Sequence, residues 1–248
     1  MSIITRSSAR ASGPAAPGRS RTPTRRTLLL GVGTLGAGLA VGAGPAAAAP
    51  TLRKGDRSSD VTALQEDLTS LNYWCGEADG SFGHITEQAV FALQKAGGLA
   101  TDGVVGPDTY GAIADGVQPS REQTEGYSFE VDLSTQLITA TWDSDLRYIL
   151  NTSTGSGEEY YSDGRWKTAT TPEGDFEMYS FYPDGWQSGS LGDLYRPGYY
   201  DRGWAIHGST SIPTYPASHG CCRISTAATD MLWSRGWMVE GRRVHVHA

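Results

Sequence analysis

Between residues 52 and 115, apolar residues recur every three or four positions. One such set consists of Val61, Leu64, Leu68 and Leu71. Because an α-helix turns once every ~3.6 residues, this spacing places the four side chains on one helical face. The pattern predicts an amphipathic helix near the start of this region, with one apolar face turned toward a core.

Residues that favour helix ends mark the start of this helix and predict two further helices. Ser59 or Asp60 is suited to cap the first helix, because a short polar side chain can accept a hydrogen bond from an unpaired backbone N–H. A second helix is predicted from about Thr86 to the glycines at 97 and 98, which favour helix ends. A third is predicted to begin at Pro107, a residue favoured in the first turn.

Two loops in this region share one pattern. Residues 79–83 are Asp-Gly-Ser-Phe-Gly, and residues 102–106 are Asp-Gly-Val-Val-Gly. Asp-Gly favours a tight turn. We expect the later glycine of each loop, Gly83 and Gly106, to take a positive φ before the next helix. This internal repeat supports a compact unit of three helices.

From residue 127 the apolar period becomes two. The alternation is clearest at Phe129, Val131, Leu133, Leu146, Tyr148 and Leu150. Successive side chains of a strand point to opposite faces, so alternation predicts β-strands. Further strands are expected at 137–142, around 176–178 and at 244–246, and only 226–233 has a helical pattern. The predicted fold is α+β: a three-helix domain followed by a mostly β domain, either a sandwich or an open barrel.

The N-terminal segment differs from both regions. Residues 1–26 contain six arginines and no acidic residue, and an apolar run rich in Leu, Gly and Ala follows to about residue 43. Together with the small residues at 46–49, this is typical of a secretory signal peptide, and the run is shorter than the ~20 apolar residues of a membrane-spanning helix. Residues 24–29 fit a twin-arginine signal, which we favour over a general secretory signal. Cleavage is expected after Ala48.

The sequence therefore predicts four segments: a signal peptide at 1–48, a helical domain at 49–115, a linker at 116–126 and a β domain at 127–248. Six of the 20 basic residues lie in the signal, so its removal leaves 14 against 27 acidic residues, a net charge near −13. Such a charge argues against non-specific nucleic-acid binding. We expect a secreted monomer with no stable membrane anchor.

The candidate chemistry lies near the C-terminus. Residues 218–223 are Ser-His-Gly-Cys-Cys-Arg, and His207-Gly208 lies fourteen residues before Cys221. A cysteine attacks as its thiolate, and a nearby imidazole commonly forms one near neutral pH. Gly220 lets backbone N–H groups approach a bound carbonyl closely. These residues suggest acyl transfer through a thioester.

This arrangement resembles the active-site signature of L,D-transpeptidases, the cysteine enzymes that cross-link bacterial peptidoglycan. The matching pieces are Ala205–Gly208, Ala217–Cys221 with Arg223-Ile224, and Thr171–Phe176. They occur in the order found in the family, and the resemblance extends from about residue 127 to residue 247. One position departs from the family pattern: Cys222 stands where Val or Ile is usual.

The resemblance implies a role for each residue of the signature. Cys221 would be the nucleophile and His207 its base, with the Gly208 carbonyl orienting the imidazole. The amides of Gly220 and Cys221 would form the oxyanion hole. His219 is a rival base on spacing alone. The family instead implies a structural or substrate-contacting role for His219. Arg223 would hold a substrate carboxylate or brace the loop, and Ser218 would contact the substrate. It implies no metal and no cofactor.

The resemblance also implies a substrate. Cys221 would attack the amide after the third residue of a peptidoglycan tetrapeptide stem and release D-Ala. The amine of another stem would then resolve the thioester, giving a 3→3 cross-link. The alternatives are a cysteine L,D-carboxypeptidase or endopeptidase, or a non-catalytic wall-binding protein. Residues 160–200, rich in aromatic and acidic side chains, are expected to form loops that wall the cleft.

The helical domain resembles the common peptidoglycan-binding domain. Besides the two Asp-Gly loops, the matching pieces are Leu52–Gly55, Leu64-Gln65 and Leu93-Gln94. This resemblance implies peptidoglycan as the partner. Tyr73, Trp74 and Phe82 could stack on sugars, but aromatic side chains in so small a unit are more often core, and we interpret them so.

The three cysteines allow several pairings. A Cys75–Cys222 disulfide would leave Cys221 free, whereas a Cys221–Cys222 bridge would disable the nucleophile and is sterically awkward. We favour three reduced thiols, with Cys75 and Cys222 as small apolar residues.

The histidines and Cys221 are residue types that can bind metals, but we interpret them here without a metal. A zinc site from His207, His219 and Cys221 is a weaker alternative to the catalytic one, because their spacing is not a common ligand pattern. His245 and His247 alternate along the last predicted strand and are interpreted as exposed polar positions.

Overall fold

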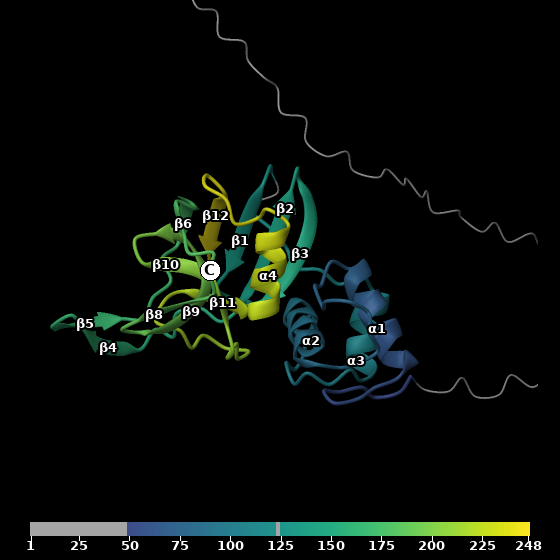
Figure 1. The fold of residues 1–248 in the computed structure, drawn as a ribbon. Helices are drawn as coiled ribbons and strands as arrows, with labels where there is room; N and C mark the ends of the chain where they lie inside the picture. Colours follow the sequence, from purple (N-terminus) through teal and green to yellow (C-terminus); the bar gives the residue numbers. More distant parts are fainter. Residues whose placement is uncertain (1–48, 123–124) are drawn as a thin grey trace, which may run out of the picture. The chain divides into compact units, whose positions relative to one another are not determined.

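The computed structural model describes residues 49–122 and 125–248 (Figure 1). Three helices come first, strands follow, and one further helix precedes the last strand. Within the described residues, no helix combines the length and apolar character needed to cross a membrane. The predicted signal peptide lies outside these residues.

The helices of the first region are α1 (Ser59–Ser70), α2 (His84–Ala96) and α3 (Pro107–Ala114). Pro107 begins α3 as predicted, and α2 ends directly before the two glycines. The cap of α1 was predicted one or two residues too late, at Ser59 or Asp60. Ser58 has the extended backbone that a cap requires, and its Oγ accepts from Val61 N at 3.3 Å.

A buried glutamine from a preceding helix holds each Asp-Gly loop. The Gln65 Nε2 donates to Asp79 Oδ1 at 3.0 Å, and its Oε1 accepts from Gly80 N at 2.9 Å. Gln94 makes the same pair of bonds with the second loop. The two loops therefore share a hydrogen-bonding pattern as well as a sequence pattern. In each loop, one glutamine side-chain amide donates to the aspartate and accepts from the backbone N–H of the glycine that follows it.

The expected positive φ falls on a different glycine of each loop. Gly80 and Gly103, the second residues of the loops, have φ of 71° and 73°. Gly83 and Gly106 instead have φ of −87° and −108°, because they are the caps of α2 and α3 and need extended backbone. The prediction of positive φ at these two later glycines is wrong.

Replacing Gln65 by leucine is expected to lower the free energy of unfolding by about 2–4 kcal/mol, because the loop loses its partner for the Gly80 N–H. The measurement is urea denaturation, with Gln118→Leu as the control. Gln118 is exposed and donates to a single carbonyl, that of Leu71. Equal stability of the Gln65 and Gln118 variants would contradict this role.

One five-stranded sheet has the order β3-β2-β1-β12-β6. Its strands are β1 (Ser128–Asp132), β2 (Leu137–Trp142), β3 (Asp145–Asn151), β6 (Gly174–Glu177) and β12 (Arg243–His247). The C-terminal strand β12 runs parallel to β1 and antiparallel to β6. Most of the strands predicted from alternation are therefore neighbours in this sheet.

The second sheet carries the candidate chemistry. Its strands are β7 (Ser180–Phe181), β8 (Trp186–Gly189), β9 (Gly192–Asp201), β10 (Trp204–Ser209) and β11 (Cys222–Ser225), and a separate hairpin joins β4 (Glu159–Ser162) to β5 (Arg165–Thr168). Helix α4 (Thr226–Ser234) follows β11 directly. The core joins both sheets to this helix, with Phe129, Ile206 and Leu232 among its fully buried members. The predicted fold class is confirmed.

The helical region packs on the first sheet, because Leu137 and Ile149 of that sheet belong to the helical core. Lys95, in the last turn of α2, donates to Asn151 Oδ1 at 2.5 Å and to Gln136 O at 3.0 Å. Burial lowers the pKa of Lys95 to about 7. These contacts lie inside one compact unit that spans residues 47–248.

All three cysteines are free thiols. Cys75 is buried in the helical core, whereas Cys222 is buried in the β core beside the Tyr200 hydroxyl, at 3.5 Å. The interpretation of Cys75 and Cys222 as small apolar residues agrees with their burial in these two cores. Tyr73 and Phe82 are likewise fully buried in the helical core, as interpreted.

Candidate active site

The pairing of β10 with β11 brings the two motifs together. The strands are parallel, with Ile206 opposite Cys222 and His207 opposite Arg223. Alternate residues of paired strands share a face. His207 and Arg223 therefore face the same side as Cys221, while Ile206 and Cys222 face the core.

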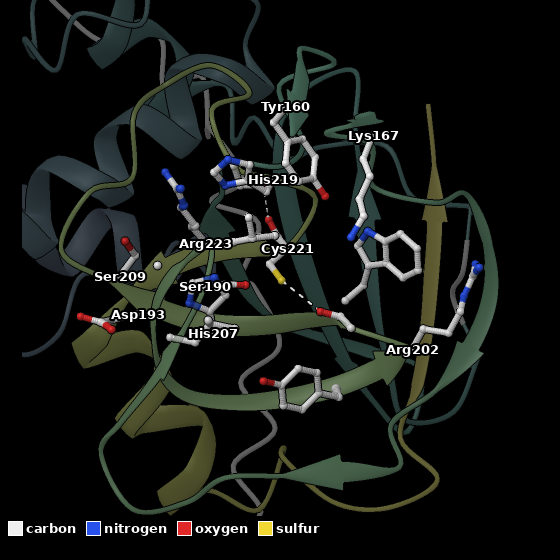
Figure 2. A pocket seen from close by; sticks show the side chains of 18 of the residues that line it. Tyr160, Lys167, Ser190, Asp193, Arg202, His207, Ser209, His219, Cys221 and Arg223 are labelled. Atoms are coloured by element: carbon white, nitrogen blue, oxygen red, sulfur yellow. Dashed lines mark hydrogen bonds between the residues drawn. The ribbon is translucent and has the colours of Figure 1, made fainter. Parts of the chain in front are cut away.

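His207, Cys221 and Arg223 line a cavity of about 610 Å³ (Figure 2). The hairpins β4–β5 and β8–β9 contribute much of its wall. The expectation that residues 160–200 wall the cleft is confirmed, although much of this segment is strand rather than loop. Pairing of the hairpins explains the difference, because it satisfies backbone groups that a loop would leave to water.

Cationic side chains predominate around the cavity. Arg165, Lys167, Arg202 and Arg223 line it, with Asp193 as the acidic member of the lining. Lys167 and Arg202 are paired with carboxylates outside the lining. Among the described residues, none forms an ion pair with Arg223. The cavity of this acidic chain is thus suited to a ligand that carries a carboxylate.

The imidazole of His207 is held in its neutral form. Its Nδ1 lies 2.8 Å from the carbonyl oxygen of Gly208, to which it can donate only as N–H. Burial lowers the pKa of His207 to about 4, so the ring is neutral at pH 7 and Nε2 carries a lone pair. Gly208 has no room for a side chain, because an added Cβ would lie 2.8 Å from Thr229 Oγ1.

Cys221 is a thiol in this resting arrangement. Burial raises its pKa, while the backbone N–H of Ala205 and the charge of Arg223 act in the opposite direction. The sulfur donates to Gly203 O at 3.5 Å. No hydrogen bond joins Cys221 to His207 in the described residues, so ionisation requires the S–H to turn toward the imidazole.

A network of hydrogen bonds fixes the loop before Cys221. The Ser218 hydroxyl accepts from Gly220 N at 2.9 Å and donates to Cys221 O at 2.7 Å. The Gly220 amide is therefore engaged within the loop, and an oxyanion role for it would require that bond to be given up. The hydroxyl of Ser218 is buried and already bonded to two backbone groups of the loop, although Ser218 lines the cavity.

Thr171 supports the same loop from outside the signature. Its hydroxyl donates to Gly220 O at 2.7 Å and accepts from Gly155 N at 2.9 Å. Thr171 belongs to the 171–176 motif, which by itself indicates no role for this residue. Thr171 is thus a positioning residue that the sequence marked but did not explain.

His219 is exposed and packs against an aromatic wall of the cavity. Its ring lies edge-on to Tyr160, with centroids 4.7 Å apart. Trp204, which sequence reasoning missed, also lines the cavity and donates through Nε1 to Thr170 O at 2.8 Å. The arrangement favours His207 over His219 as base, because only His207 is buried with a fixed tautomer.

The low pKa of His207 predicts a specific dependence of stability on pH. Above pH ~6.5 the ring is neutral in both states, whereas below it the unfolded chain takes up a proton that the folded chain refuses until about pH 4. The free energy of unfolding should fall by about 3 kcal/mol across this window. In His207→Gln the free energy of unfolding should no longer show this fall. Urea denaturation of both proteins at pH 7 and at pH 4.5 would measure the difference. An unchanged pH slope in the variant would contradict the burial of a neutral ring.

Comparison with known proteins places this geometry in a family. The model of the L,D-transpeptidase catalytic domain matches residues 126–246, which include both motifs, and that of a peptidoglycan binding domain matches residues 57–113. The crystal structure of an L,D-transpeptidase from Xylanimonas cellulosilytica is 46% identical, with a TM-score of 0.76 over 82% of this chain and 100% of that one. The chain belongs to the L,D-transpeptidase family. The resemblances drawn from the sequence are confirmed.

Two further proteins resemble a shorter part of this L,D-transpeptidase family member. The N-acetylmuramoyl-L-alanine amidase CwlL of Bacillus licheniformis is 46% identical over 65 residues, and CwlM of Mycobacterium tuberculosis is 44% identical over 50 residues. The chain spans only 18% and 12% of the lengths of these proteins. The likeness therefore covers only 25% and 20% of this chain.

Proposed function

We propose that this chain is an exported enzyme that cross-links peptidoglycan stems through a thioester on Cys221. The observation that carries the proposal is the placement of the cysteine and a neutral, tautomer-fixed His207 on one face of a cavity beside Arg223. Family membership supports the same reaction class.

The chemistry begins with transfer of the thiol proton. His207 Nε2 accepts the proton of Cys221, and the sulfur forms a bond to the carbonyl carbon after the third stem residue. The amide C–N bond then breaks, the imidazolium returns the proton to the leaving amine, and D-Ala departs. An amine of a second stem then attacks the thioester carbon and the C–S bond breaks. The attacking amine gives up a proton, which His207 passes to the sulfur so that the thiol re-forms.

Burial of both groups suits this order of events. A low pKa for His207 and a raised pKa for Cys221 favour the neutral pair over the ion pair before substrate binds. The thiolate and the imidazolium therefore form only as the substrate binds, and the thiolate forms beside the positive charge of Arg223. The backbone N–H of Cys221 is our proposed oxyanion donor, since that of Gly220 is engaged by Ser218.

The helical region would hold the enzyme on its substrate. Its family and its amidase relatives are consistent with peptidoglycan as the ligand. The two glutamine-held loops supply a rigid module for this purpose. We propose that the module binds the wall while the cavity acts on stems, and that the N-terminal signal directs the protein outside the cytoplasm.

The deciding experiment is mass spectrometry of residues 49–248 incubated with disaccharide-tetrapeptide. Cross-linked dimers with loss of D-Ala are expected. Trimmed tripeptide without dimer would make the protein an L,D-carboxypeptidase under those conditions. Binding to purified sacculi with neither product nor a covalent adduct would leave a wall-binding protein and overturn the enzymatic proposal.

Replacing Arg223 by glutamine is expected to raise the KM for the tetrapeptide donor about 10–100-fold, because a charge-assisted hydrogen bond to the donor carboxylate is lost. Arg223→Lys should restore part of the affinity. Arg147→Gln is the control, since Arg147 lies on β3 and pairs with Asp145. An unchanged KM together with a lower kcat would instead assign Arg223 to the chemistry of Cys221.

A further inference from the structure

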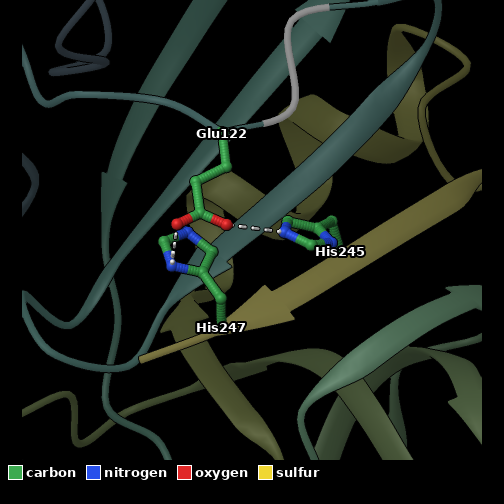
Figure 3. Close-up of side chains that lie close together, drawn as sticks. All are labelled: Glu122, His245 and His247. Atoms are coloured by element: carbon green, nitrogen blue, oxygen red, sulfur yellow. Dashed lines mark hydrogen bonds and ion pairs between the residues drawn. The ribbon is translucent and has the colours of Figure 1, made fainter.

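His245 and His247 lie two residues apart on the last strand, β12 (Figure 3). Neither of them lines the cavity that contains Cys221. Their rings are stacked, with centroids 5.3 Å apart. The prediction that they are exposed polar positions is wrong, because only 21% and 16% of the two side chains is accessible. The two histidines contact Glu122, Glu130 and Asp175, which belong to three other segments of the chain.

One nitrogen of each imidazole is held by a carboxylate. His245 Nδ1 lies 2.8 Å from Asp175 Oδ1 on β6, and His247 Nε2 lies 3.0 Å from Glu130 Oε1 on β1. A neutral imidazole in this position donates its N–H to the carboxylate. Each ring is thereby oriented with its second nitrogen directed away from that carboxylate.

The second nitrogens converge on Glu122. His245 Nε2 lies 3.3 Å from Glu122 Oε2, and His247 Nδ1 lies 3.7 Å from Glu122 Oε1. His247 Nδ1 is buried and has no hydrogen-bond partner. Ligand atoms of all three residues lie within 4.8 Å of one another. Two lone pairs that face a carboxylate repel it unless a metal ion or a ring proton lies between them.

We propose that Glu122, His245 and His247 bind one Zn²⁺ ion, with Asp175 and Glu130 orienting the imidazoles from behind. We call this set the β12 metal cluster. A metal-bound histidine usually donates its other N–H to a carboxylate or carbonyl, and both histidines here have that partner.

The spacing and the ligand type favour zinc. Tetrahedral zinc with bonds of about 2.0–2.1 Å places neighbouring ligand atoms about 3.3 Å apart, close to the 3.3 and 3.7 Å separations found here. Imidazole nitrogen disfavours Ca²⁺ and Mg²⁺, which prefer oxygen. Three protein ligands leave the fourth position to water.

The local charge also favours a cation. Three carboxylates (Glu122, Glu130 and Asp175) surround two imidazoles. With neutral rings this set carries three negative charges, which a divalent ion reduces to one. Protonation of both rings is the rival way to balance the charge, and it would need no metal.

The β12 metal cluster would have a structural role. Glu122 belongs to the segment predicted to link the helical domain to the β domain, while the histidines belong to the final strand of the first sheet. None of the three lines the catalytic cavity. The ion would therefore fasten the linker to the sheet without taking part in acyl transfer.

The test is a Zn²⁺ titration of residues 49–248, prepared without a histidine tag and carrying Cys221→Ser to remove the competing thiol. Isothermal calorimetry should show one ion per chain, and Co²⁺ should give the visible absorption of a tetrahedral complex. Zinc should also raise the Tm. Absence of binding to both metals at micromolar concentration would overturn the proposal and leave the protonated pair.

Variants locate the ion independently of activity. His245→Ala, His247→Ala and Glu122→Gln should each weaken zinc binding at least 100-fold, and the exposed His84→Ala should not. Asp175→Asn keeps all three ligands and should weaken binding about 10–100-fold. Because Asp175 is 84% exposed, this variant is expected to fold even if the others do not. Equal affinity in Asp175→Asn and in all ligand variants would place the ion elsewhere and overturn the assignment.

Discussion

Cys221→Ala is expected to reduce thioester formation and cross-linking by a factor on the order of 10³ or more, because the attacking atom is removed. Among the described residues, no second thiol lines the cavity. The measurements are intact-protein mass after incubation with a carbapenem, which should acylate the cysteine, and product analysis with disaccharide-tetrapeptide.

The adjacent Cys222 provides a matched control. It is fully buried in the β core, and burial raises its pKa to about 12, so it is a packing group rather than a nucleophile. Cys222→Ala should retain the adduct and lose about 1 kcal/mol of unfolding free energy. If Cys221→Ala still formed the adduct and Cys222→Ala did not, Cys222 would be the nucleophile instead of Cys221.

Gly220→Ala is expected to impair both folding and acylation. An added Cβ would lie 2.5 Å from Trp204 Nε1 and 2.7 Å from Thr170 O, at a φ of +132°. Relief of these clashes must move the loop that holds Cys221. We expect an unfolding free energy lower by about 3 kcal/mol. Acylation should be about 100-fold slower, because positioning within an ångström governs the rate.

The control for Gly220→Ala is Gly236→Ala. Gly236 also has a positive φ, +71°, but nothing lies within 4 Å of the added Cβ. It should cost about 1 kcal/mol through backbone strain alone and leave acylation unchanged. Stopped-flow acylation by a carbapenem and thermal denaturation measure the two effects. A Gly220 variant as stable and as fast as the Gly236 variant would show that the loop accommodates the side chain.

The alignment of β10 with β11 shows how much of the site was accessible from sequence. The motifs predicted which residues gather, and alternation along two parallel strands explains why they share a face. The same alternation sends Cys222 into the core, where Val or Ile would otherwise stand. The partner of the Gly220 amide could not be predicted, since it depends on the turn taken by Ser218.

The sequence by itself determined the features that depend on neighbouring residues. A period of three to four specified the helices, a period of two specified the strands, and Pro107 specified the start of α3. Local periodicity suffices for these elements because each buries one face regardless of its partner. The signature around Cys221 likewise predicted the chemistry, because the nucleophile and its loop are contiguous.

Only the tertiary structure decided the features that join distant residues. His245 and Glu122 are 123 positions apart, and Lys95 reaches Asn151 across 56. Burial also lowers the pKa of His207 to about 4, a value that no local pattern contains. The physical reason is the same in each case. Desolvation and pairing depend on which elements pack together, and that packing cannot be read from any local stretch of the sequence.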